Sequence, residues 1–319
     1  MKKLLCVWEL TNEQEKLLKD VAKNQYEIIL STQKTVTKEQ AQSAEIIFGN
    51  INPDLIKGSP NLRWLQLNSA GADAYLVSGV LPHGINLTNA TGAYGQSVAE
   101  HMFAMLFMLM KNLHLYRDNQ NNSLWKDEGL VATLEGACVL VVGAGDIGKY
   151  FARICKSVGA YTIGVKRRFA EKESCFDELY TAEKLDALIP RADVVISILP
   201  GTKETDGIWN AMRFSRMKQS AFFINAGRGS AVNQDDLYDA LTHHVIKAAG
   251  IDVTTPEPLP ASSKLWSVKN LMITAHAAGT HHLPATFIRI FKIALENLAR
   301  FMNGEQLANE VDFLTGYCK

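Results

Sequence analysis

A buried strand that runs into a glycine-rich turn constrains the fold of this chain more than any other feature. The strand, residues 137–142, is a continuous apolar run rich in β-branched residues, as expected for a strand covered on both faces. Gly143-Ala144-Gly145-Asp146-Ile147-Gly148 follows, and a helix is predicted from about residue 147 to 158. Such glycines allow a tight turn and a close approach to a pyrophosphate, which the helix N-terminus favours. The segment predicts a dinucleotide site at Gly143, Gly145, Asp146 and Ile147.

Five further strands support this interpretation, because a glycine-rich turn alone can arise by accident. They are expected at residues 160–165, 193–199, 221–226, 248–253 and 271–275, with helical patterns between them. Six strands with short crossovers behind a glycine fingerprint predict a Rossmann domain with a doubly wound parallel sheet.

The first 100 residues show the same strand and helix alternation and predict a second α/β domain, flavodoxin-like, for the substrate. Strands are expected at residues 4–10, 26–30, 46–50, 62–67 and 85–88. A helix at about 285–303 is long enough to return to this domain. We therefore expect a discontinuous substrate domain of residues 1–100 and 285–319, a dinucleotide domain of residues 101–284, and a cleft between the two.

The connection between the domains is expected to be a long helix from Ser97 to about Arg117, followed by a polar loop or arm at residues 118–128. Trp125 is the large apolar residue of that arm. It either caps the edge of a core or contacts a second subunit.

Composition excludes several classes of function. The 319 residues include 33 basic and 33 acidic residues, so no net charge favours nucleic acid or an anionic membrane. The five cysteines show no C-x-x-C spacing, and no signal peptide precedes them, which favours free thiols in a reducing cytoplasm. The most apolar window, residues 102–110, is too short to span a bilayer. No metal site is predicted.

The residues after the second Rossmann strand indicate which dinucleotide is bound. NAD sites usually place an acidic residue there for the ribose 2′-hydroxyl. This chain has Lys166, Arg167 and Arg168 instead, and guanidinium groups suit a 2′-phosphate. The sequence therefore favours NADP(H) over NAD(H), although such cations can also be solvated surface residues.

Three polar residues follow consecutive strands where a parallel sheet exposes its carboxyl edge. They are Arg228, Glu257 and His276. Each alone has an ordinary structural explanation, but together they supply what hydride transfer to a ketone requires. An imidazole can donate the proton, a neighbouring carboxylate favours the protonated imidazole, and a guanidinium binds and polarises the substrate.

Several motifs resemble the D-isomer-specific 2-hydroxyacid dehydrogenase family over nearly the whole chain. They are Asn-Ala-Gly-Arg-Gly at 225–229, Asp-Val-x-x-x-Glu-Pro at 252–258, the His276 segment, Val-Ala-Glu-His at 98–101 and Leu-Pro-x-Thr-x-x-Thr at 199–205. The basic run at 166–168 makes the NADPH-preferring glyoxylate/hydroxypyruvate and related 2-ketoacid reductases the more similar members.

The resemblance implies roles for individual residues. Arg228 would bind and polarise the substrate, His276 would be the acid/base, and Glu257 would be its partner. Backbone N–H groups of Ser69, Ala70 and Gly71 would bind the substrate carboxylate. Without the resemblance, the sequence of this loop favours an ordinary turn. Cofactor contacts would include Leu199, Pro200, Thr205, Ala226, Arg228, Asp252, His276 and Gly279. Members typically form homodimers through the dinucleotide domain.

Two other readings remain open. The same fold occurs in dinucleotide-sensing corepressors, which retain the three polar residues, and loss of turnover with intact NADPH binding would favour that alternative. Relatives acting on formate typically have glutamine where this chain has Glu257, which argues against that class. Tyr94, His281, His282 and Leu283 are further candidates for lining the substrate pocket.

Overall fold

The computed structural model describes residues 1–168, 171, 173–279, 283–314, 316 and 318, and it divides into two compact units. The first unit combines Met1–Ala93 with His281–Lys319, and the second unit is Tyr94–Thr280. The chain leaves the first unit earlier than the expected residue 100, because Gly95 already begins helix α4 of the second unit. His281 and His282 lie outside the described residues.

The first unit contains a five-stranded, fully parallel sheet with the order β2-β1-β3-β4-β5. This is the flavodoxin-like order, as predicted. The point where the strand order reverses lies between β1 and β3, and parallel sheets of this kind bind ligands at such points. The strands are β1 Lys2–Cys6, β2 Tyr26–Leu30, β3 Ile46–Phe48, β4 Trp64–Gln66 and β5 Asn86–Thr88.

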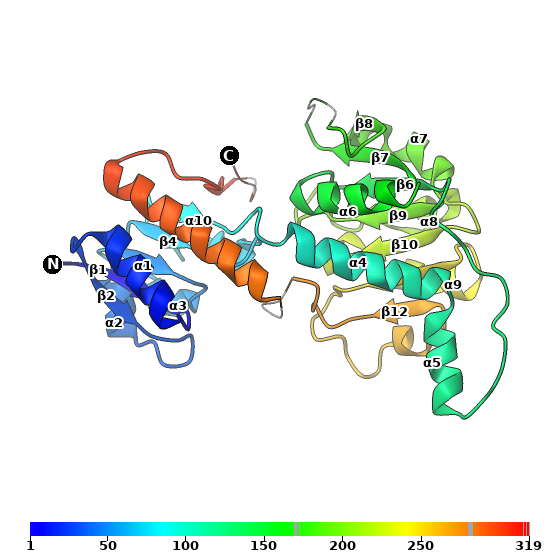
Figure 1. Cartoon of the computed structure of the whole chain (residues 1–319), viewed down its shortest axis with the longest axis horizontal. Helices are drawn as coiled ribbons and strands as arrows, with labels where there is room; N and C mark the ends of the chain where they lie inside the picture. The colour runs from blue at the N-terminus through cyan, green and yellow to red at the C-terminus, as the bar shows by residue number, and fades with distance from the viewer. Residues whose placement is uncertain (169–170, 172, 280–282, 315, 317, 319) are drawn as a thin grey trace. The chain divides into compact units, whose positions relative to one another are not determined.

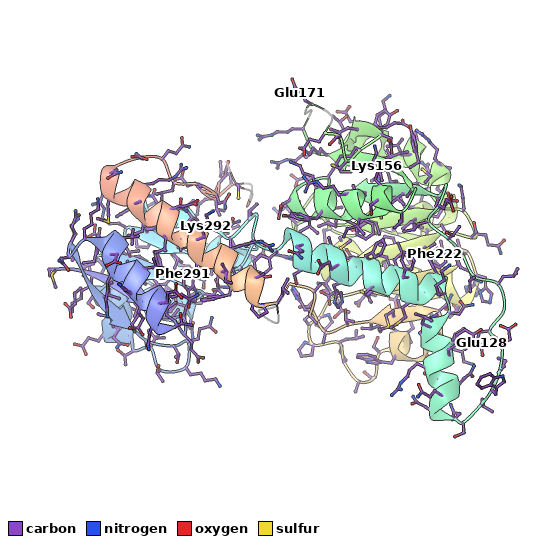
Figure 2. The ribbon with its side chains drawn as sticks, viewed as in Figure 1. Glu128, Lys156, Glu171, Phe222, Phe291 and Lys292 are labelled. Carbon is purple, nitrogen blue, oxygen red and sulfur yellow. The ribbon has the colours of Figure 1, made fainter. Side chains whose placement is uncertain are left out.

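Threonine capping boxes begin two helices of the first unit. Thr11 caps α1 and Thr37 caps α2, each with a glutamine three residues later that bonds back to the cap. The long helix α10 packs beside α1, so a segment from the end of the chain completes the unit (Figure 1). On α10, Phe291 is buried and the next residue, Lys292, is exposed (Figure 2). The helices are α1 Asn12–Ala22, α2 Lys38–Ser43, α3 Pro53–Ile56 and α10 Pro284–Asn303.

The second unit contains a seven-stranded, fully parallel sheet with the order β12-β11-β10-β9-β6-β7-β8. Counted from β6, this is the Rossmann order 3-2-1-4-5-6 with one further strand after the sixth. The strands are β6 Cys138–Val142, β7 Tyr161–Lys166, β8 Glu178–Thr181, β9 Val194–Ser197, β10 Phe222–Asn225, β11 Ala248–Ile251 and β12 Leu271–Ile273. The sequence predicted six of these strands and missed β8. All residues of β8 are half-buried, so its sequence contains no apolar run.

The helices of the second unit correct one further prediction. The helix expected to continue to Arg117 ends at Met110, because Asn112 adopts a left-handed conformation with φ 54°. The buried side chain of Asn112 donates hydrogen bonds to the carbonyl groups of Glu128 and Leu130, which favours the break. The helices are α4 Gly95–Met110, α5 Leu113–Asn121, α6 Asp146–Ser157, α7 Leu185–Leu188, α8 Ala211–Arg216 and α9 Gln234–Thr242.

Helices α4 and α6 lie side by side over the second sheet (Figure 1). A large apolar core joins the strands of this sheet to helices α7, α8 and α9. Trp209 is fully buried there, and its indole N–H donates to Ser197 Oγ at 2.9 Å. Within the described part of the chain, none of the helices has the length and apolar composition needed to cross a bilayer.

Candidate active site

The glycine turn after β6 has the geometry of a dinucleotide cradle. Gly143 has φ 105°, and a Cβ atom there would lie 2.3 Å from the carbonyl oxygen of Ile198, so no side chain fits. A Cβ on Gly148 would lie 2.4 Å from the Gly143 oxygen, which explains how closely α6 packs on the strand. A Cβ on Gly145, in contrast, would meet nothing within 4 Å. The open side of the turn is therefore at Gly145.

Helix α6 begins at this open position. Gly145 is its N-cap residue and supplies no side-chain cap, and Asp146 and Ile147 form its first turn. N–H groups at an uncapped helix start, together with the helix dipole, attract phosphate oxygens.

The basic run ends strand β7. Lys166 is half-buried, whereas Arg167 and Arg168 are exposed. Glu204 belongs to the loop after β9. Hydrogen bonds from the Thr202 side chain and from backbone lower the pKa of Glu204, and the positive charge of Arg167 adds a smaller lowering effect.

The loop after β9 is held by a threonine. Thr205 Oγ1 donates to the Pro200 carbonyl oxygen at 2.6 Å and accepts from the Thr202 N–H at 3.0 Å. Such side-chain to backbone bonds hold a loop in one conformation. Leu199 also lies close to the next loop, because a Cβ on Gly227 would be 2.4 Å from the Leu199 oxygen.

Arg228 follows β10 and lies between Gly227 and Gly229, where neighbouring loops leave no room for a side chain. A Cβ on Gly229 would lie 2.0 Å from the Thr254 oxygen, so the loops after β10 and β11 are in direct contact. Asn225 braces the turn: its side chain donates to the Arg228 carbonyl at 3.1 Å and accepts from the Gly227 N–H at 3.3 Å. The guanidinium Nη1 of Arg228 donates to the Gly227 oxygen at 2.9 Å. Ala226, next to these glycines, is half-buried.

Glu257 and His276 form the pair that the sequence suggests. His276 Nδ1 lies 2.9 Å from Glu257 Oε2, and the other carboxylate oxygen accepts from the Thr254 N–H at 3.0 Å. A carboxylate only accepts, so Nδ1 holds the proton of this bond and Nε2 faces away from Glu257. Half of the His276 side chain is exposed. The imidazole is thus oriented and open to a reactant.

Asp252 binds the segment that presents His276. Its side chain is 2% exposed. Oδ1 accepts from Thr274 Oγ1 at 2.5 Å and from the Ala277 N–H at 2.8 Å, and Oδ2 accepts from the Ala278 N–H at 3.1 Å. The Asp252 carbonyl accepts from the His276 N–H at 2.7 Å. The resemblance implied a cofactor contact for Asp252, and the structure adds a role in positioning this loop.

The loop after β4 in the first unit has exposed donors. Among the hydrogen bonds of the described residues, none uses the N–H groups of Ser69, Ala70 or Gly71. The loop is nevertheless held in place. The backbone N–H of Asn50 donates to Asn68 Oδ1 at 2.7 Å, and the N–H of Asn68 donates to Asn50 Oδ1 at 3.1 Å. Sequence reasoning did not identify Asn50, which follows β3 at the same edge of the sheet.

The remaining candidates lie at the ends of the second unit or next to it in the chain. Tyr94 is buried, and burial raises the pKa of its hydroxyl to about 12. Its ring packs near Gly279, where a Cβ would lie 3.7 Å from Tyr94 Cδ1. Leu283 is the N-cap residue of α10 in the first unit.

Comparison with known proteins places this fold and these motifs in a family. Residues 103–278, more than half of the chain, match the model described as "D-isomer specific 2-hydroxyacid dehydrogenase, NAD binding domain". A Corynebacterium melassecola protein, described as an uncharacterized protein in the proB 3′ region, is 34% identical over 88% of this chain and 92% of its own. Human glyoxylate reductase/hydroxypyruvate reductase is 29% identical over 79% of this chain and 77% of its own.

A solved structure covers almost the entire chain. The D-isomer specific 2-hydroxyacid dehydrogenase family protein of Aeromonas salmonicida subsp. salmonicida A449 is 32% identical, with a TM-score of 0.85 over 98% of this chain and 99% of its own. This chain therefore belongs to the D-isomer specific 2-hydroxyacid dehydrogenase family, whose typical reaction is the NAD(P)-dependent reduction of 2-oxo acids.

Proposed function

We propose that this protein reduces a small 2-oxo acid to the D-2-hydroxy acid with NADPH. The observation that supports this most directly is the 2.9 Å contact between His276 and Glu257 at the carboxyl edge of a Rossmann sheet, one loop away from Arg228. Glyoxylate and hydroxypyruvate are the first substrates to test, because the human relative is named for them.

The glycine turn fits a dinucleotide. The backbone is bare at Gly145, and Gly143 has no room for a side chain, so a pyrophosphate can approach the start of α6. When bound, the dihydronicotinamide supplies the hydride for the reduction.

His276 acts as the proton donor in this proposal. Hydride addition places negative charge on the ketone oxygen, and His276 Nε2 gives a proton to that oxygen. Glu257 accepts the Nδ1 hydrogen bond, which fixes the orientation of the ring. Arg228 binds the substrate and polarises its carbonyl with a charge that does not depend on pH.

The first unit is proposed to bind the substrate carboxylate. The N–H groups of Ser69, Ala70 and Gly71 are successive donors in one partly exposed turn, an arrangement that suits an anion. The reciprocal bonds between Asn50 and Asn68 hold this turn in its conformation before the ligand arrives.

The preference for NADPH rests on the end of β7. Lys166, Arg167 and Arg168 offer charge-assisted hydrogen bonds to a 2′-phosphate, and the acidic residue that would bind a free 2′-hydroxyl is missing. Arg167→Asp should therefore lower kcat/KM for NADPH and raise it for NADH.

Initial rates with glyoxylate, hydroxypyruvate, pyruvate, phenylpyruvate and branched 2-oxo acids, each with NADPH and with NADH, test the proposal. We expect turnover of at least one small 2-oxo acid and a higher kcat/KM with NADPH. Equal kcat/KM for the two cofactors, with an unchanged ratio in Arg167→Asp, would contradict the cofactor assignment. No turnover together with intact NADPH binding would favour a dinucleotide-sensing interaction protein instead.

The expected arm starts later than residue 118, because α5 continues to Asn121, and the arm is defined here as residues 122–132. The second unit is also proposed to form a homodimer through this exposed arm. Four large apolar side chains of the arm are exposed: Leu124, Trp125, Leu130 and Val131. Despite this exposure the arm is ordered by hydrogen bonds, including Asn119 Nδ2 to Glu128 Oε1 at 2.6 Å and Lys111 Nζ to the Ala132 oxygen at 2.7 Å. Glu128 lies beside α5 (Figure 2). An ordered apolar surface of this kind suits a second copy of the chain.

A further inference from the structure

We propose that His101 is a positioning residue for His276 and acts through a hydrogen-bond chain that runs from His101 to Thr274 and Asp252. His101 lies on α4, and its Nε2 atom is 3.0 Å from Thr274 Oγ1 and 3.7 Å from Asp252 Oδ1. The inference deepens the proposed reduction and rests on it, since it concerns the proton donor of that reaction.

The direction of each hydrogen bond follows from Asp252. An ionised carboxylate accepts only, so the Thr274 hydroxyl donates its proton to Oδ1, at 2.5 Å. Met105 Sδ is 3.9 Å from the same hydroxyl and is a weak acceptor that does not compete. The Thr274 oxygen can then only accept from His101. His101 Nε2 must therefore hold a hydrogen, in the neutral as well as in the charged ring.

Asp252, at the end of this hydrogen-bond chain, binds the backbone around His276, the proposed proton donor. Asp252 accepts from the N–H groups of Ala277 and Ala278 through its side chain and from the N–H of His276 through its carbonyl. These bonds surround His276, whose φ of 51° is left-handed and unfavourable for a residue with a Cβ atom. The carboxylate thus holds the segment that aims the imidazole at its reactant.

His101 also supports a buried carboxylate through the hydrogen bond that it donates to Thr274. Asp252 is 2% exposed, and among the described residues the ion pairs place no lysine or arginine next to its carboxylate. A buried carboxylate depends on its hydrogen-bond donors, and the donation from His101 strengthens the Thr274 hydroxyl as a donor through polarisation. Loss of His101 should therefore loosen residues 274–278 without changing the glycine turn or the basic run.

Matched substitutions distinguish the effect of the His101 hydrogen-bond donor from the effect of the volume of its ring. His101→Gln keeps an N–H near the Nε2 position, whereas His101→Leu keeps a similar volume without a donor. Thr274→Ser keeps the hydroxyl, and Thr274→Val removes it while retaining the shape. The readouts are amide hydrogen exchange of Ala277 and Ala278, followed by NMR, and steady-state kinetics with glyoxylate and NADPH.

We expect His101→Leu and Thr274→Val to speed exchange of both amides and to lower kcat by roughly 10-fold, the effect of one lost hydrogen bond on a positioned group. The dissociation constant for NADPH should change by less than kcat does, because neither residue contacts the glycine turn or the basic run that are proposed to hold the phosphates. His101→Gln and Thr274→Ser should stay close to wild type, and the double variant His101→Leu/Thr274→Val should lose no more than either single variant.

Three results would overturn the inference: unchanged amide exchange in His101→Leu, an unchanged kcat in that variant, or an equal loss in His101→Gln. Failure of the proposed function would look different. In that case the wild-type protein itself would not turn over any 2-oxo acid, while the exchange measurement would still test the hydrogen-bond chain.

Discussion

His276 combines an unfavourable backbone with a fully determined side-chain orientation. A left-handed conformation costs a residue with a Cβ about 1 kcal/mol. Hydrogen bonds from His276, Ala277 and Ala278 to Asp252 offset that cost. The pair with Glu257 then fixes the ring, so the proposed proton donor is oriented before any reactant arrives. Preorganised groups of this type contribute to rate because they need no rearrangement in the transition state.

Glu257→Gln tests the role of the carboxylate. An amide oxygen can still accept the Nδ1 hydrogen bond, but it carries no negative charge beside the ring. The kcat for reduction should therefore fall by about 10-fold, the effect of weakening one charge-assisted hydrogen bond, while the affinity for NADPH stays nearly unchanged. The measurement is kcat for a 2-oxo acid together with the dissociation constant for NADPH.

Two controls accompany this measurement. His276→Ala and Arg228→Ala should remove most activity, since they remove the proposed proton donor and the proposed substrate-binding charge. A kcat of Glu257→Gln equal to that of the wild type would refute the role proposed for the carboxylate, and full activity in either control would refute the site as a whole.

Sequence reasoning could place Arg228, Glu257 and His276 at one edge of the second sheet, because each follows a predicted strand and parallel strands end at one edge of a sheet. It could not predict the contacts of His101 or Asn50. His101 contacts a residue 173 positions further along the chain, and Asn50 bonds to a residue 18 positions away. Neither spacing corresponds to a periodicity or a motif, so only the folded arrangement shows these contacts.

Strand β8 shows the limit of prediction at the level of elements. It pairs with β7 at the edge of the sheet and is half-buried throughout, so polar contacts take the place of an apolar run. Glu178 accepts bonds from both guanidinium nitrogens of Arg191 and from the Tyr161 and Tyr180 hydroxyls. The guanidinium of Arg191, with the tyrosine bonds, lowers the pKa of Glu178 to about 2.

Glu178→Gln should destabilise the protein in a pH-dependent way. The folded-state pKa of Glu178 is depressed from the ordinary 4.5 to about 2, so the contribution is complete above pH 4.5 and disappears as the pH falls towards 2. Solvent screening limits it to about 1 kcal/mol or less. Urea unfolding at pH 7, 4 and 3 should show a difference from the wild type that narrows with acidity.

Glu183→Gln is the matched control for this prediction, since Glu183 is an exposed glutamate that follows the same strand. It should unfold like the wild type at each pH. A stability difference for Glu178→Gln that stays constant from pH 7 to pH 3 would contradict the ionic contribution of the Glu178 and Arg191 pair.

The break between α4 and α5 matters at the scale of the whole molecule, because it allows the arm to run back along α5. We expect the wild-type protein to sediment as a dimer and Trp125→Ala to shift the equilibrium towards the monomer, since large aromatic side chains contribute strongly to interfaces. Sedimentation velocity over a range of protein concentrations measures this shift.

Trp266→Ala provides the comparison, because Trp266 is another exposed tryptophan of the second unit and lies outside the arm. It should leave the sedimentation profile unchanged. A wild-type protein that is monomeric at all concentrations, or a dimer that Trp125→Ala does not weaken, would exclude the arm as the interface.

Helix α10 has a consequence for biosynthesis. The first unit needs this late segment: Asn297 of α10 donates to buried Gln66 at 3.0 Å, and Val311 N–H donates to the Leu87 oxygen at 2.8 Å. The ribosome makes all of Tyr94–Thr280 before it makes α10. The second unit can therefore fold while the chain is still growing, and the segment translated first must wait for its missing helix. Translation therefore begins with the first unit, but the second unit is the first that can be completed.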